Sequence, residues 1–189
     1  SQTPTPTLSI SPLQIIGWIW LAGAVVFLLF QLISYQMFLR KLKASHVQER
    51  PEALKQTIWQ LGVDMGICRL PEAIITDTVE APVLIGVLQP RVLLPRTSYT
   101  HEELAFILRH ELVHYRRRDM WYKLALMLAN ALHWFNPLVY LMTIQAAKDI
   151  ELACDDDVAK DLDSETRVRY GNTILAALPR KRRLEPVFS

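Results

Sequence analysis

The sequence has no charged residue before Arg40, so all 21 basic and 19 acidic side chains lie in the last 150 of its 189 residues. Cysteine is also scarce: Cys68 and Cys154 are the only two, so no framework of disulfide bonds is predicted. A net charge of only +2 argues against a protein that coats a polyanion, and direct nucleic-acid binding is not expected. Because 51% of the residues are hydrophobic, a disordered chain is excluded as well.

The uncharged beginning of the chain predicts a transmembrane helix over residues 13–39. These 27 residues would form a helix about 40 Å long, more than the roughly 30 Å of a hydrocarbon core. Residues 1–12, rich in Ser, Thr and Pro, are expected to be an extracytoplasmic linker. Arg40, Lys41 and Lys43 follow the span at once, which predicts a cytoplasmic domain and an outside amino terminus. The lipid bilayer is therefore the first predicted partner.

The remainder of the chain predicts an α+β domain, mainly helical, over residues 40–178, followed by a basic tail over residues 179–189. A helix is expected over residues 51–65, and proline residues separate short strands at 73–76, 83–88 and 92–94. The last two strands are expected to form a hairpin of a small β-sheet. Thr100 and Glu103 match a capping box that starts a helix ending near Arg117. A final helix is expected to end before Pro179.

The string His110-Glu111-Leu112-Val113-His114 matches the H-E-x-x-H pattern inside that capped helix. Residues i and i+4 lie one above the other on a helix face, so His110 and His114 can bind one metal ion. Glu111 is rotated by about 100° from His110, which leaves it beside the metal, where it can take a proton from water. We therefore interpret Glu111 as the catalytic base of a site that holds one zinc ion per chain.

A catalytic zinc needs a third protein ligand, and its position separates the classes of protease. A metzincin would carry glycine and histidine where this chain has Met120 and Lys123, and an intramembrane protease would need an Asp-Gly pair that is missing. Glu151 with Asp155 four residues later fits the gluzincin arrangement: Glu151 as a ligand and Asp155 as a partner that orients a ligand histidine. Cys154 is the alternative third ligand.

Residues 124–147 contain no charged residue and could be mistaken for another membrane span. A continuous span would separate His114 from Glu151 by roughly 30 Å. A break at Phe135-Asn136-Pro137 instead predicts a helical hairpin that returns Glu151 to His114. The hairpin is expected to be buried in the domain or to dip into the membrane without crossing it.

Three further features have both a functional and an ordinary interpretation. Val83, Leu84, Ile85 and Gly86 can form an edge strand that pairs with an extended substrate, or an ordinary core hairpin. Tyr170 can stabilise an oxyanion, or pack the final helix. The basic run at residues 180–183 can be a site of self-cleavage, which would make the chain its own partner, or a solvated tail.

The motifs together resemble the membrane metallopeptidases of the BlaR/MecR antirepressor type. The resemblance rests on residues 110–119 (HELVHYRRRD), 133–137 (HWFNP) and 151–156 (ELACDD), on Tyr170, and on the spacing of Pro82, Gly86 and Pro90 before Leu94-Pro95. It implies a zinc endopeptidase on the cytoplasmic side of a bacterial plasma membrane. In β-lactam-sensing members, an extracellular penicillin-binding domain activates the protease, and a DNA-binding repressor is inactivated by proteolysis. This chain has no such domain and one clear span, and is expected to be a fragment.

The sequence thus predicts a membrane-anchored zinc endopeptidase that cleaves a protein substrate, with a cytoplasmic transcriptional repressor as the expected target. Two alternatives stay open. One is a membrane signalling module whose zinc site is not catalytic, against which the intact Glu111 argues, because a structural site has no use for a base. The other is a quality-control protease that acts broadly.

Overall fold

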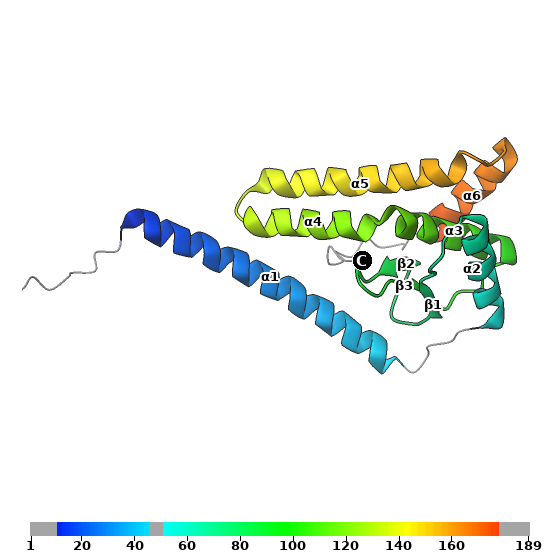
Figure 1. Ribbon diagram of the computed structural model, residues 1–189, viewed down its shortest axis with the longest axis horizontal. Coiled ribbons are helices and arrows are strands. Elements are labelled where there is room, and N and C mark those ends of the chain that lie inside the picture. The colour runs from blue at the N-terminus through cyan, green and yellow to red at the C-terminus, as the bar shows by residue number, and fades with distance from the viewer. Residues whose placement is uncertain (1–10, 46–50, 178–189) are drawn as a thin grey trace, which may run out of the picture.

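The structure is a computed structural model that describes residues 11–45 and 51–177. This part of the chain contains six helices and one three-stranded sheet, which confirms the predicted, mainly helical α+β fold with a small sheet (Figure 1). The predictions for residues 1–10 of the linker and for the tail, including the proposed self-cleavage at 180–183, lie outside the described residues.

The first helix, α1 (Pro12–Ala44), begins with a capping box in which the Ser11 hydroxyl accepts from the backbone N–H of Gln14. It continues five residues beyond the predicted end at Leu39, because the basic residues that follow are good helix formers and need no membrane around them. Only three of its side chains are buried, at Ala24, Gln31 and Leu42. Among the described helices, α1 alone is long and apolar enough to cross a membrane.

The sheet consists of β1 (Glu72–Ile75), β2 (Val83–Ile85) and β3 (Arg91–Leu94), in the spatial order β1-β3-β2. β3 runs parallel to β1 and antiparallel to β2, so the predicted hairpin is confirmed. The strand predicted over residues 83–88 is too long, since the chain turns at Gly86, whose φ is +83°. A side chain there would be strained by this φ and would collide with the carbonyl oxygen of Gln89.

Alternating side chains of the sheet face two different helices. Val92 and Leu94 join Leu84 in a cluster with α2 (Glu52–Asp64) and α3 (His101–Arg117). Leu93, between them on β3, packs on the opposite face against Leu42 near the end of α1. The sheet therefore holds α3 on one side and the last turns of α1 on the other.

The predicted helical hairpin is confirmed as α4 (Asp119–Leu132) and α5 (Pro137–Ala159). Asn136 ends the break between them, because its side-chain oxygen accepts from the N–H of Leu138 at 3.0 Å. Between the two legs, the buried Thr143 hydroxyl donates to the side-chain oxygen of Asn130 at 3.0 Å. α5 therefore returns alongside α4 to the domain, where the last helix, α6 (Ser164–Ala177), packs on α3 (Figure 1).

The tip of the hairpin is attached to α1. The indole N–H of Trp20 donates to the carbonyl of Leu132 at 2.8 Å, and that of Trp134 donates to the carbonyl of Trp20 at 3.2 Å. Gly23 makes room for this contact, since a Cβ atom there would overlap the Trp134 ring. The helix that is able to span a membrane and the hairpin thus lie against each other far from the sheet.

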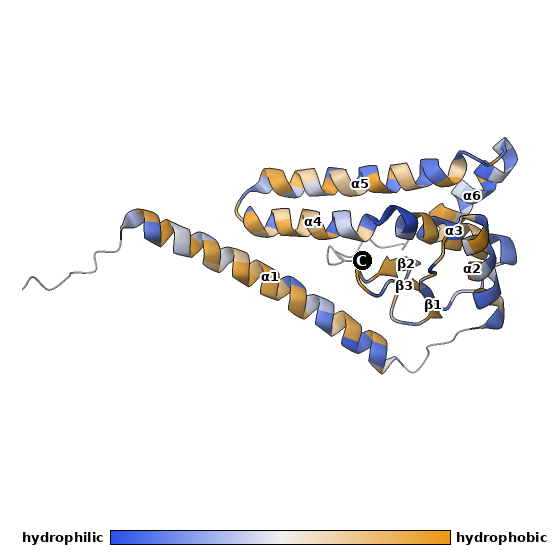
Figure 2. Ribbon diagram, in the orientation of Figure 1, coloured by the Kyte–Doolittle hydropathy of each residue, from blue (hydrophilic) through white to orange (hydrophobic). Residues whose placement is uncertain are grey.

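The hairpin is not buried inside the domain, which removes one of the two explanations for its apolar sequence. Figure 2 shows apolar residues along α1, α4 and α5, away from the sheet. The exposed apolar side chains of the hairpin include Leu128, Leu132, Phe135, Leu138, Leu141, Met142 and Ile144. Such a continuous exposed surface next to an apolar helix favours the remaining explanation, contact with lipid.

Candidate metal centre

The centre is built on α3, whose start is held by a complete capping box. The Thr100 hydroxyl accepts from the backbone N–H of Glu103, and the Glu103 carboxylate accepts from the backbone N–H of Thr100 at 2.8 Å. One face of α3 packs on the sheet through Ile107, Leu108 and Leu112. A second face carries His110 and His114, both buried, towards α5 and α6.

α5 brings Glu151 to the two histidines, as the sequence predicted. The Nε2 atoms of His110 and His114 lie 3.1 Å apart. Oε2 of Glu151 lies 3.6 Å from Nε2 of His110 and 3.4 Å from Nε2 of His114. The three atoms thus form a nearly regular triangle, although the residues belong to two helices far apart in the sequence.

This triangle fits a tetrahedral zinc ion. With bonds of about 2.0–2.1 Å to nitrogen and oxygen, two tetrahedral ligands lie about 3.3 Å apart. The three observed separations bracket this value. Two imidazole nitrogens and one carboxylate oxygen are also the ligand types of catalytic zinc sites, which leave a fourth position open. His110, His114 and Glu151 therefore suit zinc in both geometry and chemistry.

His110 is held from behind by α5 and α6. Its Nδ1 atom lies 2.9 Å from the hydroxyl of Tyr170 and 3.2 Å from Oδ1 of Asp155. The same hydroxyl donates to Asp155 at 2.7 Å. A hydrogen bond from Nδ1 leaves the lone pair of Nε2 free for a metal. Asp155 thus lies where the sequence expected a partner of a ligand histidine.

Tyr170 lies on the Nδ1 side of His110, next to Asp155. Its hydroxyl contacts the Nδ1 side of His110, whereas the Nε2 side faces His114 and Glu151. This position favours a role in orienting His110 over the expected role in stabilising an oxyanion. Burial, the largest cause, raises the pKa of the Tyr170 hydroxyl above its usual range, and so it stays a proton donor.

His114 has its own buried partner, Asp119, which the sequence analysis missed. Oδ2 of Asp119 lies 2.7 Å from Nδ1 of His114, and the residue is only 1% exposed. Five residues along one helix do not share a face, so spacing alone does not pair the two. The chain turns at Arg118, whose φ is +61°, and this turn brings Asp119 back to His114. The one available signal was its place at the end of the HELVHYRRRD string.

Cys154, the alternative third ligand, is fully buried and also lies near the histidines. Its sulfur lies 3.7 Å from Nδ1 of His110 and donates to the backbone carbonyl of the same residue at 3.5 Å. Burial raises the pKa of this thiol, but His110 and His114 outweigh that effect and lower the pKa below its usual value, so protonation does not exclude Cys154 as a ligand. Contact with Nδ1, however, puts the sulfur behind the ring. The geometry therefore favours Glu151.

The charges around the centre favour a bound cation. Burial lowers the pKa of His114, but its hydrogen bonds to Asp119 and other partners outweigh this and raise the pKa to about 11. Burial raises the pKa of Glu151, and the two histidines more than reverse this, so the net pKa lies well below the usual range. Asp155 also has a lowered pKa, first because of its hydrogen bond to His110. Ionised carboxylates thus surround the imidazole rings.

Glu111 differs from these carboxylates because it has no partner. It is buried, at 7% exposure, and forms no hydrogen bond or ion pair with another residue in the described ranges. Its carboxylate oxygens are not sealed from solvent, because no fully buried side-chain oxygen of the described residues lacks a hydrogen-bond partner. A carboxylate that has no protein partner and is open to water is able to accept a proton from a water molecule.

The expected substrate strand lies next to α3. β2 is at one end of the strand order, and its Leu84 packs in the same cluster as Ile107 and Leu108 of α3. Val83, Leu84 and Ile85 form this strand, whereas Gly86 belongs to the turn that follows it. No other described strand pairs with the outer edge of β2, so that edge can accept an extended peptide.

Comparison with known proteins identifies the family. Residues 1–188 match the family described as BlaR1 peptidase M56. The chain is 35% identical over 99 residues to the "Regulatory protein BlaR1" of Bacillus licheniformis, an alignment that covers 51% of this chain and 16% of that protein. It is 23% identical over 164 residues to the "Methicillin resistance mecR1 protein" of Staphylococcus aureus, covering 83% of this chain and 27% of that protein.

The match to the family spans nearly the whole chain, including the helix α1, the H-E-x-x-H helix and the hairpin. The alignments with the two relatives cover little more than a quarter of their lengths at most. The family resemblance read from the motifs is thereby confirmed, and the chain belongs to the BlaR1 peptidase M56 family.

Proposed function

We propose that this chain is a membrane-anchored zinc endopeptidase. The observation that carries the proposal is the triangle of ligand atoms from His110, His114 and Glu151, with the unpaired carboxylate of Glu111 beside it. A structural zinc site is closed by four protein ligands and needs no free base. Three ligands with a neighbouring free carboxylate are the arrangement of a hydrolase.

The residues divide the work of peptide hydrolysis. A zinc ion held by the three ligands would polarise the scissile carbonyl and make a water molecule acidic enough to lose a proton near neutral pH. Glu111 takes that proton and later delivers it to the leaving amine. Asp155 and Tyr170 orient His110, while Asp119 orients His114. The free edge of β2 aligns an extended segment of the substrate.

The location follows from the charges that flank α1. Arg40, Lys41 and Lys43 at its end support an orientation with the catalytic domain in the cytoplasm and the amino terminus outside a bacterial plasma membrane. The exposed apolar surface of the hairpin enters the same bilayer. The metal centre, at the domain end of the hairpin, is then close to the membrane surface.

For the substrate, we propose a cytoplasmic DNA-binding repressor whose cleavage transmits a signal. Two relatives are named as a regulatory protein and as a methicillin resistance protein, which supports a signalling role in antibiotic response over broad protein degradation. An edge strand recognises an extended segment of backbone, so the cleaved site would lie in a flexible part of the repressor.

Proteolysis in a reconstituted system tests the proposal. The full chain in lipid nanodiscs, loaded with zinc, is incubated with purified candidate repressors, and products are identified by mass spectrometry. We expect cleavage by the wild-type chain and none by Glu111→Gln, with both proteins binding one zinc ion. Equal cleavage by both would remove Glu111 from the mechanism. Zinc binding without cleavage of any protein would instead support the signalling module with a non-catalytic site.

A further inference from the structure

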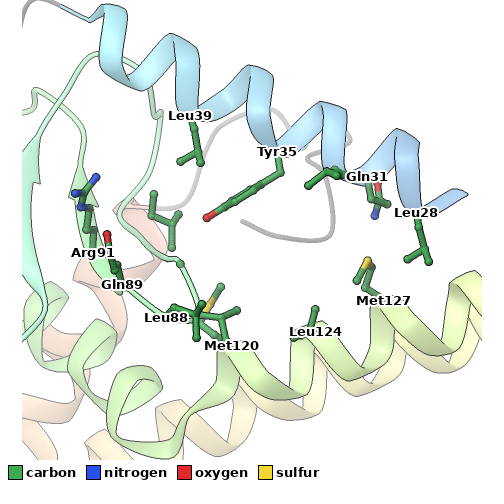
Figure 3. A pocket seen from close by; sticks show the side chains of 14 residues that line it. Leu28, Gln31, Tyr35, Leu39, Leu88, Gln89, Arg91, Met120, Leu124 and Met127 are labelled. Atoms are coloured by element: carbon green, nitrogen blue, oxygen red, sulfur yellow. The ribbon is translucent and has the colours of Figure 1, made fainter. Parts of the chain in front are cut away.

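A cavity of about 630 Å³ lies between α1, α4 and the turn that joins β2 to β3 (Figure 3). It is within the range of about 300–1,000 Å³ that is usual for small-molecule sites. The wall formed by α1 runs from Leu28 to Leu39, and the wall formed by α4 runs from Met120 to Met127. The twelve residues of α1 from Leu28 to Leu39 extend over about 16 Å along this wall.

The charged end of the cavity lies next to the sheet, whereas the far end is mainly apolar and also contains Gln31 (Figure 3). Arg91 and Gln89 lie at the end next to the sheet, and Leu28 and Met127 lie at the opposite end (Figure 3). Leu124 lines the side between them. The ligand that matches this order has a polar, anionic head and a hydrocarbon tail of roughly the length of the cavity.

The residues around the cavity indicate that such a ligand would come from the lipid bilayer. The α1 wall belongs to the apolar run that qualifies as a membrane span, and exposed apolar residues of the hairpin lie beyond it. Beyond Leu39, the last residue of α1 that lines the cavity, the helix continues into Arg40, Lys41 and Lys43. Basic residues at the end of a span attract anionic headgroups. The apolar end of the cavity is thus turned towards lipid and the polar end towards the domain.

We propose that the cavity is a binding site for one anionic phospholipid, with an acyl chain along Leu124 and Leu28 and the phosphate near Arg91. The lipid would fill the gap between two fixed contacts of α1, the packing of Leu42 on the sheet and the contact of Trp20 with the hairpin tip. This inference rests on the membrane insertion that is part of the proposed function, and it is independent of the zinc chemistry.

Retention of lipid by purified protein tests the site. The full chain is extracted from membranes into a mild detergent, exchanged extensively, and analysed by native mass spectrometry for bound phospholipid. We expect one phospholipid per chain in the wild type and its loss in Leu124→Trp, because the indole occupies the cavity. Leu128→Trp is the matched control: it lies one turn further along α4 and is exposed outside the cavity, so it should keep the lipid.

A second pair of variants tests the headgroup. Arg91 is paired with Glu72 at 3.3 Å, so both variants break the ion pair, but Arg91→Gln removes the positive charge whereas Glu72→Gln leaves it in place. After delipidation, the proteins are offered phosphatidylglycerol or phosphatidylethanolamine. We expect the wild type and Glu72→Gln to prefer phosphatidylglycerol, and Arg91→Gln to lose this preference.

Two results would overturn the proposal. One is equal retention of lipid by the wild type and Leu124→Trp. The other is a disulfide bond from Leu124→Cys to another protein segment in the native membrane, because that segment would then occupy the cavity. Zinc content and Glu111-dependent cleavage are measured on the same preparations. If a variant loses the lipid but keeps its zinc content and its Glu111-dependent cleavage, the lipid site is independent of the peptidase function.

Discussion

The Nδ1 atom of His114 lies 2.7 Å from Oδ2 of Asp119, and Asp119 is the first residue of α4. The other end of α4 is attached to α1, because the carbonyl of Leu132 accepts from the indole of Trp20. A single helix therefore connects a candidate metal ligand with the helix that is long and apolar enough to span a membrane. A displacement of α1 relative to the hairpin would therefore move α4 and change the contact between Asp119 and the ring of His114.

Replacing Asp119 should weaken zinc binding without removing a ligand. In Asp119→Asn, the ring of His114 loses a charged partner, and we expect zinc affinity to fall by about 10–100-fold. Competition with a chromophoric chelator measures this affinity directly. Asp157→Asn is the matched control, since Asp157 binds Arg116 and Lys160 at the surface and should leave affinity unchanged. An unaltered affinity in Asp119→Asn would show that the contact does not orient His114.

Glu151 and Asp155 lie one turn apart on α5 and should respond differently to loss of charge. Glu151→Gln removes a ligand, so we expect zinc binding and activity to be lost together. Asp155→Asn leaves the three ligands in place, so it should bind zinc at saturating metal with about 10–100-fold lower affinity or activity. Zinc titration of the two variants decides the roles. If Asp155→Asn loses zinc and Glu151→Gln keeps it, Asp155 is the ligand and Glu151 the orienting residue. If both variants keep zinc, Cys154 is the next candidate for the third ligand.

Tyr170→Phe distinguishes orientation of His110 from stabilisation of an oxyanion. The hydroxyl contacts both His110 and Asp155, so its removal should lower zinc affinity together with activity, by up to about tenfold. The measurement is zinc affinity beside kcat and KM at saturating metal. If affinity stays constant while kcat falls by about 100-fold or more, the loss of one oxyanion donor explains the result better.

The contact of Trp134 at Gly23 can be tested by adding a side chain. Gly23→Val places methyl groups where the indole lies, and we expect overpacking to cost about 1–3 kcal/mol of stability. Gly17→Val is the control on the same helix, because a Cβ atom at Gly17 meets no neighbour within 4 Å. Thermal unfolding of both variants in the same detergent measures the difference. Equal melting temperatures would mean that the hairpin does not rest on α1.

The orientation of α1 is tested by labelling single cysteines in cells. In a background with Cys68→Ser and Cys154→Ser, a membrane-impermeant maleimide should label Thr5→Cys in intact cells and Glu52→Cys only after lysis. The basic residues that follow the span provide the physical reason. The opposite labelling pattern would place the catalytic domain outside and contradict a cytoplasmic substrate.

Local patterns in the sequence were sufficient for the elements and for most residues of the candidate site. Thr100 and Glu103 locate the start of α3, and the four-residue spacing of His110 and His114 puts both on one face, because a helix repeats every 3.6 residues. Asn136-Pro137 likewise locates the break in the hairpin. The end of α1 was misplaced, since the sequence shows where an apolar run ends but not where the helix does.

Contacts between helices decided which residues orient the two histidines. Spacing cannot bring Asp119 to His114, because the pairing depends on the left-handed turn at Arg118. Nor can it show that Tyr170 lies behind His110, which depends on how α6 packs on α3. The sequence alone determined which side chains are chemically able to bind a metal and approximately which helices carry them. Only the tertiary structure decided which of their atoms meet, because packing of separate helices sets distances that no local period encodes.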